Sequence, residues 1–328
     1  MQTKPLGRSG IPAPRIGLGT ATFGREIDEA ESCRIIDYAL ARGINLLDTA
    51  EAYGGGEARD YRRNSLGVED VRETSGEHHS SEKIIGRWLR SNGRRQDIVL
   101  TTKVSTNFTR EHVRQAVEAS LERLQTDYID LYLFHSYDPN TPLAEALGAM
   151  NEIKKSGLVR AFGCSNFSAE QVRAALTLTA EHGLERLEAV ESICNLAARE
   201  AERDMLPLCR GEQLGFLAYS PLGAGFLAGK YTGDRAGFPA GSRFDVIPAH
   251  ADVYFSEQNF QTVRDLHAFA SRCGIPALRL AFAWVLAHPS VTTVLCGART
   301  TAHIDNAVAS LELGPPAAWP ASLEPNAV

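Results

Sequence analysis

Residues 97–135 read DIVLTTKVSTNFTREHVRQAVEASLERLQTDYIDLYLFH, and this stretch decides the fold. Its two ends, Ile98–Lys103 and Tyr128–His135, are short apolar runs typical of buried strands. Between them, the segment Arg110–Leu124 repeats apolar residues at helical spacing. A strand, a helix and a second strand in this order form the repeating unit of a parallel α/β fold.

The same alternation runs through the whole chain and predicts a (β/α)₈ barrel in a single domain. The competing doubly wound sheet is disfavoured, because residues 17–22, GLGTAT, lack the third glycine of a dinucleotide fingerprint. Eight strands are expected at Arg15–Gly19, Asn45–Asp48, Ile98–Lys103, Tyr128–His135, Val159–Cys164, Leu187–Ile193, Gly215–Ser220 and Val291–Cys296. Further helices are expected at Asp28–Arg42, Leu143–Lys155 and Ala169–Glu181, with Thr109 and Ser168 as N-caps and Gly43 and Gly157 after helix ends.

Composition and charge point to an ordinary globular enzyme. The 328 residues are 44% hydrophobic and 23% charged, and the net charge of -6 gives no reason to expect a nucleic-acid or acidic-membrane partner. The N-terminus lacks an apolar signal core and the six cysteines show no C-x-x-C pairing, so we expect a cytoplasmic protein with reduced, buried thiols. The oligomeric state stays open.

Four polar residues follow the expected strands at or just beyond their carboxyl ends: Asp48, Tyr53, Lys103 and His135. Parallel barrels place their chemistry at this end. Singly, Asp48, Tyr53 and His135 are explained as well by capping or packing, whereas a lysine rarely ends an apolar strand without a partner. Together they predict a proton-donor site for a substrate carbonyl.

Several motifs give the chain a resemblance to the aldo-keto reductases. Residues 43–54, GINLLDTAEAYG, and 121–132, LERLQTDYIDLY, followed by His135, are similar to the two signatures of that family. Residues 163–167, 219–223 and 297–300 resemble three further blocks in the family's order. The resemblance covers nearly the whole chain and implies reversible reduction of an aldehyde or ketone by NADPH.

The resemblance implies one role for each of the four residues. Tyr53 would be the general acid, Lys103 would lower the pKa of its phenol, and Asp48 would keep that lysine charged and oriented. His135 would hydrogen-bond the substrate oxygen. No metal is implied.

The resemblance also assigns residues to the nucleotide. Ser165 and Asn166 would bind the carboxamide, Tyr219 would stack on the nicotinamide, and Arg299 would hold the 2′-phosphate. The pyrophosphate would be wrapped by a small-residue loop, and a further set of positions belongs to the cofactor blocks. The loop residues are Ser220, Leu222, Gly223 and Gly225, and the others are Glu191, Gly297, His303 and Asn306.

Three departures from the family affect these expectations. Glu191 stands where Gln is common and adds negative charge, which leaves the preference for NADPH over NADH open. Asn306 and Ala307 stand where Glu-Asn is common, and His303 replaces a Gln or Arg. The third departure is an insertion, Gly55–Ser80, which we expect to be a polar loop forming a lid or substrate-pocket wall.

Alternatives remain beside the main hypothesis. The insertion could be a passive loop, and a metal site at His78-His79 is disfavoured because no second ligand pair accompanies it. A second long segment, Ala224–Ser256, follows the seventh strand, and Pro315–Val328 is expected to be a surface tail. A nucleotide-binding regulatory protein with little turnover and a Schiff-base aldolase using Lys103 are the other functional classes.

Overall fold

The structure, a computed structural model, describes residues 1–67, 73–233, 237–316 and 318–325. Parts of three predicted segments lie outside the described residues: 68–72 of the insertion, 234–236 of the segment after the seventh strand, and 317 and 326–328 of the tail.

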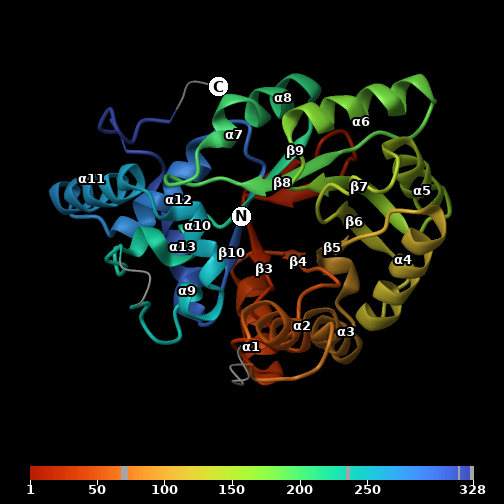
Figure 1. Ribbon diagram of the computed structural model, residues 1–328, viewed down its shortest axis with the longest axis horizontal. Coiled ribbons are helices and arrows are strands. Elements are labelled where there is room, and N and C mark those ends of the chain that lie inside the picture. Colours follow the sequence, from red (N-terminus) through yellow and green to blue (C-terminus); the bar gives the residue numbers. More distant parts are fainter. Residues whose placement is uncertain (68–72, 234–236, 317, 326–328) are drawn as a thin grey trace.

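Eight parallel strands close into a barrel in the order β10-β3-β4-β5-β6-β7-β8-β9, as predicted (Figure 1). A separate antiparallel pair, β1 (Thr3–Pro5) and β2 (Pro12–Pro14), was not expected from the sequence. The barrel strands are β3 (Ile16–Gly19), β4 (Leu46–Asp48), β5 (Val99–Val104), β6 (Ile129–Phe134), β7 (Val159–Ser165), β8 (Ala189–Ile193), β9 (Gly215–Tyr219) and β10 (Thr293–Gly297).

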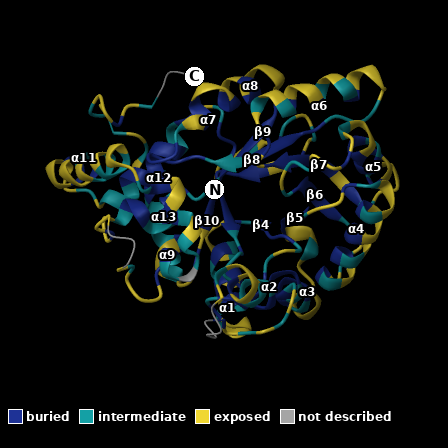
Figure 2. Cartoon of the chain, viewed as in Figure 1, coloured by how far each residue is buried: buried dark blue, intermediate teal, exposed yellow. Residues whose placement is uncertain are grey.

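Helices surround the barrel, and their outer faces carry most of the exposed residues (Figure 2). The α-helices are α1 (Glu29–Ala41), α2 (Gly55–Tyr61), α3 (Ser80–Asn92), α4 (Arg110–Leu124), α5 (Leu143–Lys155), α6 (Ala169–Glu181), α7 (Glu200–Arg203), α8 (Met205–Glu212), α9 (Arg243–Val246), α10 (Ala251–Tyr254), α11 (Glu257–Cys273), α12 (Ala277–Ala287) and α13 (Thr301–Leu313). Short helical turns of other types are η1 (Arg62–Leu66), η2 (Arg95–Asp97), η3 (Gly223–Ala228) and η4 (Pro248–His250).

The strands are apolar on both faces because both faces are covered. In β6, Leu131 and Leu133 belong to the core inside the barrel, whereas Tyr132 and Phe134 pack in the core between strands and helices. The inner core also contains Leu6, Ile11 and Ala13 from the β1–β2 region, so this hairpin closes one end of the barrel. The candidate catalytic residues lie at the opposite end, where the strands have their carboxyl ends.

The predicted helix ends are confirmed with one exception. Ser168 forms a capping box with Gln171, and Gly43 and Gly157 adopt φ values of 77° and 82° just after their helices. Thr109 stands at the N-cap of α4, but its hydroxyl makes no capping bond and donates instead to Asn107. The predicted cap position is therefore confirmed, without a capping bond from the side chain.

One expectation about the rest of the chain needs correction, and the expected surface tail gains a detail. The insertion is not a loop throughout, because α2 and η1 occupy its first part and buried Gly55 and Gly56 lie within α2. The described tail is anchored, since Leu323 is buried and its carbonyl accepts from Trp284 Nε1 at 2.7 Å. The six cysteines are free, and four are buried, while Cys273 is exposed.

Within the described ranges, no single helix is long and apolar enough to cross a bilayer. Helices α11 and α12 meet that criterion only as a pair, and they are bent by 103° at their junction.

Candidate active site

Adjacent strands bring Asp48 and Lys103 together. Parallel pairing sets Asp48, the last residue of β4, opposite Thr101 of β5, and Lys103 follows two residues later on the same side of the strand. The Nζ of Lys103 donates to Asp48 Oδ1 at 2.6 Å and to the Thr49 carbonyl at 2.9 Å. Burial lowers the pKa of Lys103, but the neighbouring carboxyl groups, Asp48 first and then Glu191, outweigh it and leave the pKa raised. The ammonium therefore stays charged.

Tyr53 lies over this ion pair. The Nζ of Lys103 is 5.1 Å from the centroid of the Tyr53 ring, and the ring of His135 meets it edge-on at 5.6 Å. Burial raises the pKa of Tyr53 to about 12, although the charge of Lys103 acts to lower it. The predicted lowering by Lys103 is thus present, but burial exceeds it. The Tyr53 side chain is half-buried. A pKa raised above its usual value of about 10 keeps its phenol protonated at neutral pH.

His135 follows β6 and completes the set. Its backbone N–H donates to the Val104 carbonyl at 2.8 Å, and its Nδ1 lies 3.4 Å from Ser105 Oγ. Burial, followed by the charge of Lys103, lowers the pKa of His135 to about 3. A neutral imidazole whose Nδ1 accepts from Ser105 can donate from Nε2. The structure therefore brings all four predicted catalytic residues to one end of the barrel.

Glu191 of β8, which the resemblance assigns to the nucleotide, also joins this cluster. Its contact with Lys103 was not expected from the sequence. Glu191 is 2% exposed, and its Oε2 lies 3.4 Å from Lys103 Nζ. Burial, reinforced by the charge of Asp48, raises the pKa of Glu191 to about 8. Burial thus opposes the negative charge that was expected at Glu191 and favours its neutral carboxyl.

Three residues assigned to the nicotinamide lie beside His135. Asn166, with a left-handed φ of 58°, donates from Nδ2 to the His135 carbonyl at 2.9 Å and to Ser165 Oγ at 3.1 Å. Tyr219 at the end of β9 donates from its hydroxyl to Asn166 Oδ1 at 2.8 Å. Ser165, Asn166 and Tyr219 thus form one hydrogen-bonded group on the catalytic rim.

The loop after β9 is strongly curved. Ser220, Gly223, Ala224 and Gly225 all have positive φ, which tightens the turn around Leu222. The N–H groups of Gly223 and Gly225 donate within the loop, to the carbonyls of Ser220 and Leu222. These two N–H groups are therefore engaged in the turn in this structure.

The remaining predicted nucleotide residues follow β10. Gly297 and Arg299 are exposed, and the Arg299 N–H donates to His303 Nδ1 at 3.1 Å. Asn306 accepts from Arg279 Nε at 3.3 Å, so a neighbouring helix engages its side-chain oxygen. Ala307 is buried against the core and offers no polar contact.

A cluster of arginines near Arg299 was missed by the sequence analysis. Arg25 and Arg243 both bind the carboxylate of Glu26, with Nε to Oε2 and Nη1 to Oε1 distances of 2.9 Å. Burial lowers the pKa of Arg243 to about 10, with Arg25 adding to the effect and Arg299 contributing to it as well. Three arginines around one carboxylate leave surplus positive charge, which suits phosphate groups. In the sequence, the available indication was Arg243, a basic residue in the long segment that follows β9.

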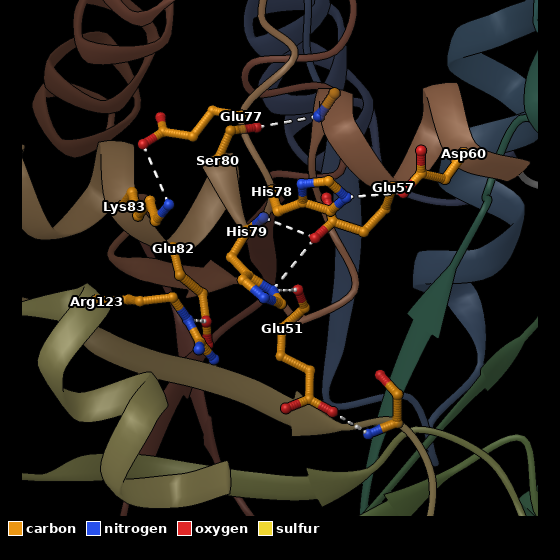
Figure 3. A network of polar contacts seen from close by, with 12 residues as sticks. Glu51, Glu57, Asp60, Glu77, His78, His79, Ser80, Glu82, Lys83 and Arg123 are labelled. Carbon is orange, nitrogen blue, oxygen red and sulfur yellow. Dashed lines mark hydrogen bonds and ion pairs between the residues drawn. The ribbon is translucent and has the colours of Figure 1, made fainter.

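The C-terminal part of the insertion takes part in a network of polar contacts that includes Glu57 and Asp60 of α2 (Figure 3). The backbone N–H of His79 donates to Glu57 Oε1 at 2.7 Å, and His78 Nε2 lies 2.8 Å from Asp60 Oδ2. The N–H of Ser81 donates to the Tyr53 carbonyl at 3.1 Å. The insertion therefore ends directly against the backbone of Tyr53, while its two histidines pair with acidic residues of α2.

Comparison with known proteins agrees with this geometry. Residues 15–316 match the model of the Aldo/keto reductase family. The chain is 32% identical to the uncharacterized oxidoreductase YrpG of Bacillus subtilis, over 95% of this chain and 92% of that protein. It is also 32% identical to Protein tas of Escherichia coli, covering 95% of this chain and 94% of that protein.

A relative with a different name is a probable voltage-gated potassium channel subunit beta of Arabidopsis thaliana. It is 30% identical over 96% of this chain and 92% of its own length. The family thus includes proteins named for catalysis and proteins named for association with a channel. With its barrel, its strand-end cluster and a family match over most of its length, the chain belongs to the aldo/keto reductase family of oxidoreductases.

Proposed function

We propose that the protein catalyses the reversible, NADPH-dependent reduction of an aldehyde or ketone to an alcohol, with Tyr53 as general acid. The observation that carries this proposal is the Tyr53 ring 5.1 Å from the buried Nζ of Lys103, which in turn donates to Asp48 at 2.6 Å. A carbonyl that accepts a hydride becomes an alkoxide, and it needs a proton donor and fixed positive charge beside it.

Each side chain has one task in this mechanism. Tyr53 gives its proton to the carbonyl oxygen, and Lys103 stabilises the phenolate that remains. His135, neutral because of burial, donates a hydrogen bond that orients the substrate oxygen. The hydride would come from bound NADPH, which leaves the nicotinamide ring positively charged.

The residues at the rim fit a phosphorylated dinucleotide. Arg25, Arg243 and Arg299 supply more positive charge than Glu26 neutralises, on three separate segments of the rim. The 2′-phosphate distinguishes NADPH from NADH, and the exposed side chain of Arg299 is the one that we assign to it. Ser165, Asn166 and Tyr219 would orient the nicotinamide.

Substrate selection would fall to the insertion Gly55–Ser80. Its segment 73–79 is bonded to the loop after β3, where Thr74 N–H and Ser75 N–H donate to the carbonyls of Arg25 and Gly24. It therefore joins the rim beside both Tyr53 and the arginine cluster.

Two other functions are distinguishable from this proposal. A Schiff-base aldolase needs a neutral amine, whereas Lys103 is buried between two carboxyl groups that favour its charged form. A binding or regulatory protein is suggested by the channel-subunit name of one relative, but the assembled proton-donor set favours turnover.

A turnover screen tests the proposal. The purified protein is mixed with NADPH or NADH and a panel of aldehydes, ketosugars and polycyclic ketones, while the absorbance of the reduced nucleotide is followed. Consumption that depends on both carbonyl and NADPH is the expected result. Tight NADPH binding without consumption across the panel would favour the regulatory function, and borohydride trapping of a carbonyl on Lys103 would favour the aldolase.

A further inference from the structure

The catalytic cluster contains two carboxyl groups around a single ammonium group. Asp48 and Glu191 flank Lys103 at 2.6 and 3.4 Å, and the exposed fractions of these three residues are 3%, 2% and 0%. If both carboxyls were ionised, the cluster would hold a net negative charge in a nearly dry core. Such a charge is costly, so burial favours one proton shared by the pair.

The geometry assigns that proton to Glu191. Asp48 accepts a short hydrogen bond from Lys103 Nζ, which stabilises its ionised form. The Oε2 of Glu191 is buried without a hydrogen-bond partner among the described residues, and its 3.4 Å contact with Lys103 is an ion-pair contact only. Glu191 is thus the carboxyl whose charge is less well compensated.

Ionisation of Glu191 would change the field on everything around Lys103. The charged and titratable groups that face it are Asp48 of β4, Lys103 of β5, Tyr53 and Tyr219. Lys103 keeps its charge, because its pKa is raised. Burial raises the pKa of Asp48, although the charge and the hydrogen bond of Lys103 act to lower it, and burial also raises the pKa values of both tyrosines. Above a pH of about 8, Glu191 is therefore the member of this group that changes charge.

A hydride donor must lie close to this carboxyl. In the proposed reaction the carbonyl oxygen would lie within hydrogen-bond reach of the Tyr53 hydroxyl, and a hydride donor would need to approach the carbonyl carbon to about 3–3.5 Å. Tyr53 and Glu191 both contact Lys103, at 5.1 Å from the ring centroid and 3.4 Å respectively. A nicotinamide that reacts beside Tyr53 would therefore lie within roughly 10 Å of Glu191, where unit charges interact appreciably at protein dielectric values.

We propose that Glu191 is a redox-state selector: its neutral carboxyl accepts the reduced nicotinamide, and its carboxylate favours the positively charged oxidised nicotinamide. This inference rests on the proposed function, because it needs a nicotinamide nucleotide in the site. It makes Glu191 a positioning residue that acts through charge. The equilibrium between free substrate and product is unchanged, whereas the nucleotide form that occupies the enzyme at a given pH changes.

The test measures binding without a carbonyl substrate. Dissociation constants of NADP⁺ and NADPH are determined by fluorescence between pH 6.5 and 9.5 for the native protein and for Glu191→Gln, which keeps the shape of the neutral carboxyl. The ratio Kd(NADP⁺)/Kd(NADPH) should fall by about 10- to 100-fold across this range in the native protein. It should stay constant within about twofold in Glu191→Gln, because the amide does not titrate. Both nucleotides carry the same 2′-phosphate, so its titration cancels in the ratio.

A second readout follows from linkage. If oxidised nucleotide favours the carboxylate, binding of NADP⁺ at pH 7.5 must release part of a proton from Glu191. Calorimetry in two buffers of different ionisation enthalpy should detect this release in the native protein and not in Glu191→Gln. Glu188→Gln is the matched control. Glu188 is a buried residue that directly precedes β8, and its side chain accepts from the backbone N–H of Arg8 instead of contacting Lys103. This variant should behave like the native protein.

Each outcome has one meaning. A ratio that does not vary with pH in the native protein, or that varies equally in Glu191→Gln, overturns the inference while leaving the proposed function intact. A pH step that persists in Glu191→Gln but disappears in Tyr53→Phe identifies the phenol as the titrating group and also overturns it. If neither nucleotide binds at any pH, the proposed function itself fails.

Discussion

Replacement of Tyr53 by phenylalanine removes one oxygen atom and leaves the packing of the ring in place. The contacts with the His135 ring at 5.6 Å and with Lys103 Nζ at 5.1 Å involve the ring, so they are retained. With a pKa of about 12, only a fraction of roughly 10⁻⁵ of the tyrosine is ionised at pH 7. The native protein therefore carries the proposed proton donor in its protonated form in almost every molecule, and the variant lacks that proton.

The expected loss is the usual contribution of a general acid. A fall in kcat/KM of about 10²- to 10⁴-fold corresponds to roughly 2.7–5.5 kcal/mol of lost transition-state stabilisation. The dissociation constant for NADPH should change by less than about threefold, because the phenol is assigned to the carbonyl rather than to the nucleotide. Steady-state NADPH consumption with an aromatic aldehyde and fluorescence titration with NADPH measure the two quantities separately.

A tyrosine elsewhere in the barrel provides the control. Tyr132 of β6 is fully buried, and its hydroxyl has no hydrogen-bond partner within the described ranges. Tyr132→Phe should keep native kcat/KM and equal or higher stability, since a buried hydroxyl without a partner contributes little. A Tyr53→Phe enzyme that reduces carbonyls at a rate within about fivefold of the native one would refute the assignment of Tyr53 as the acid.

Four further predictions use other parts of the molecule. Lys103→Met should lower kcat/KM by at least ~10²-fold, because the Tyr53 phenolate loses its stabilising charge; native kinetics would contradict this. Arg299→Ala should weaken NADPH by about 10- to 150-fold and NADH far less, as titrations of both nucleotides would show; equal losses would mean that another residue reads the 2′-phosphate. Gly86→Ala should lower stability by about 1–3 kcal/mol in urea unfolding, because its Cβ would lie 2.0 Å from the Arg123 carbonyl oxygen, whereas Gly148→Ala, with no atom closer than 3.7 Å, should be tolerated. Exchange of Gly55–Ser80 for a short glycine connector should leave nucleotide binding but alter KM across a carbonyl panel, and unchanged KM and kcat would make the insertion a bystander.

The sequence alone determined the barrel and pointed to most of the candidate catalytic set. Burial on both faces produces continuous apolar strands, and amphipathic helices between them repeat with a fixed period, so all eight strands could be located. The position of Lys103 at the end of such a strand was informative, because a buried lysine requires an anionic partner. These patterns depend on residues that are close together in the sequence, so they can be recognised without knowledge of the fold.

The tertiary structure decided what depends on barrel closure. Glu191 lies far from Lys103 along the chain, and only the register of β8 within the closed barrel sets the two groups 3.4 Å apart. The convergence of Arg243 with Arg25 on Glu26 likewise joins the loops after β9 and β3. The β1–β2 hairpin was not predicted from the sequence. Both of its strands have three residues and contain proline, so they show no periodic pattern. Periodicity reports whether a residue is buried, whereas the charges that share a buried volume, and hence their pKa values, are fixed only when distant strands meet.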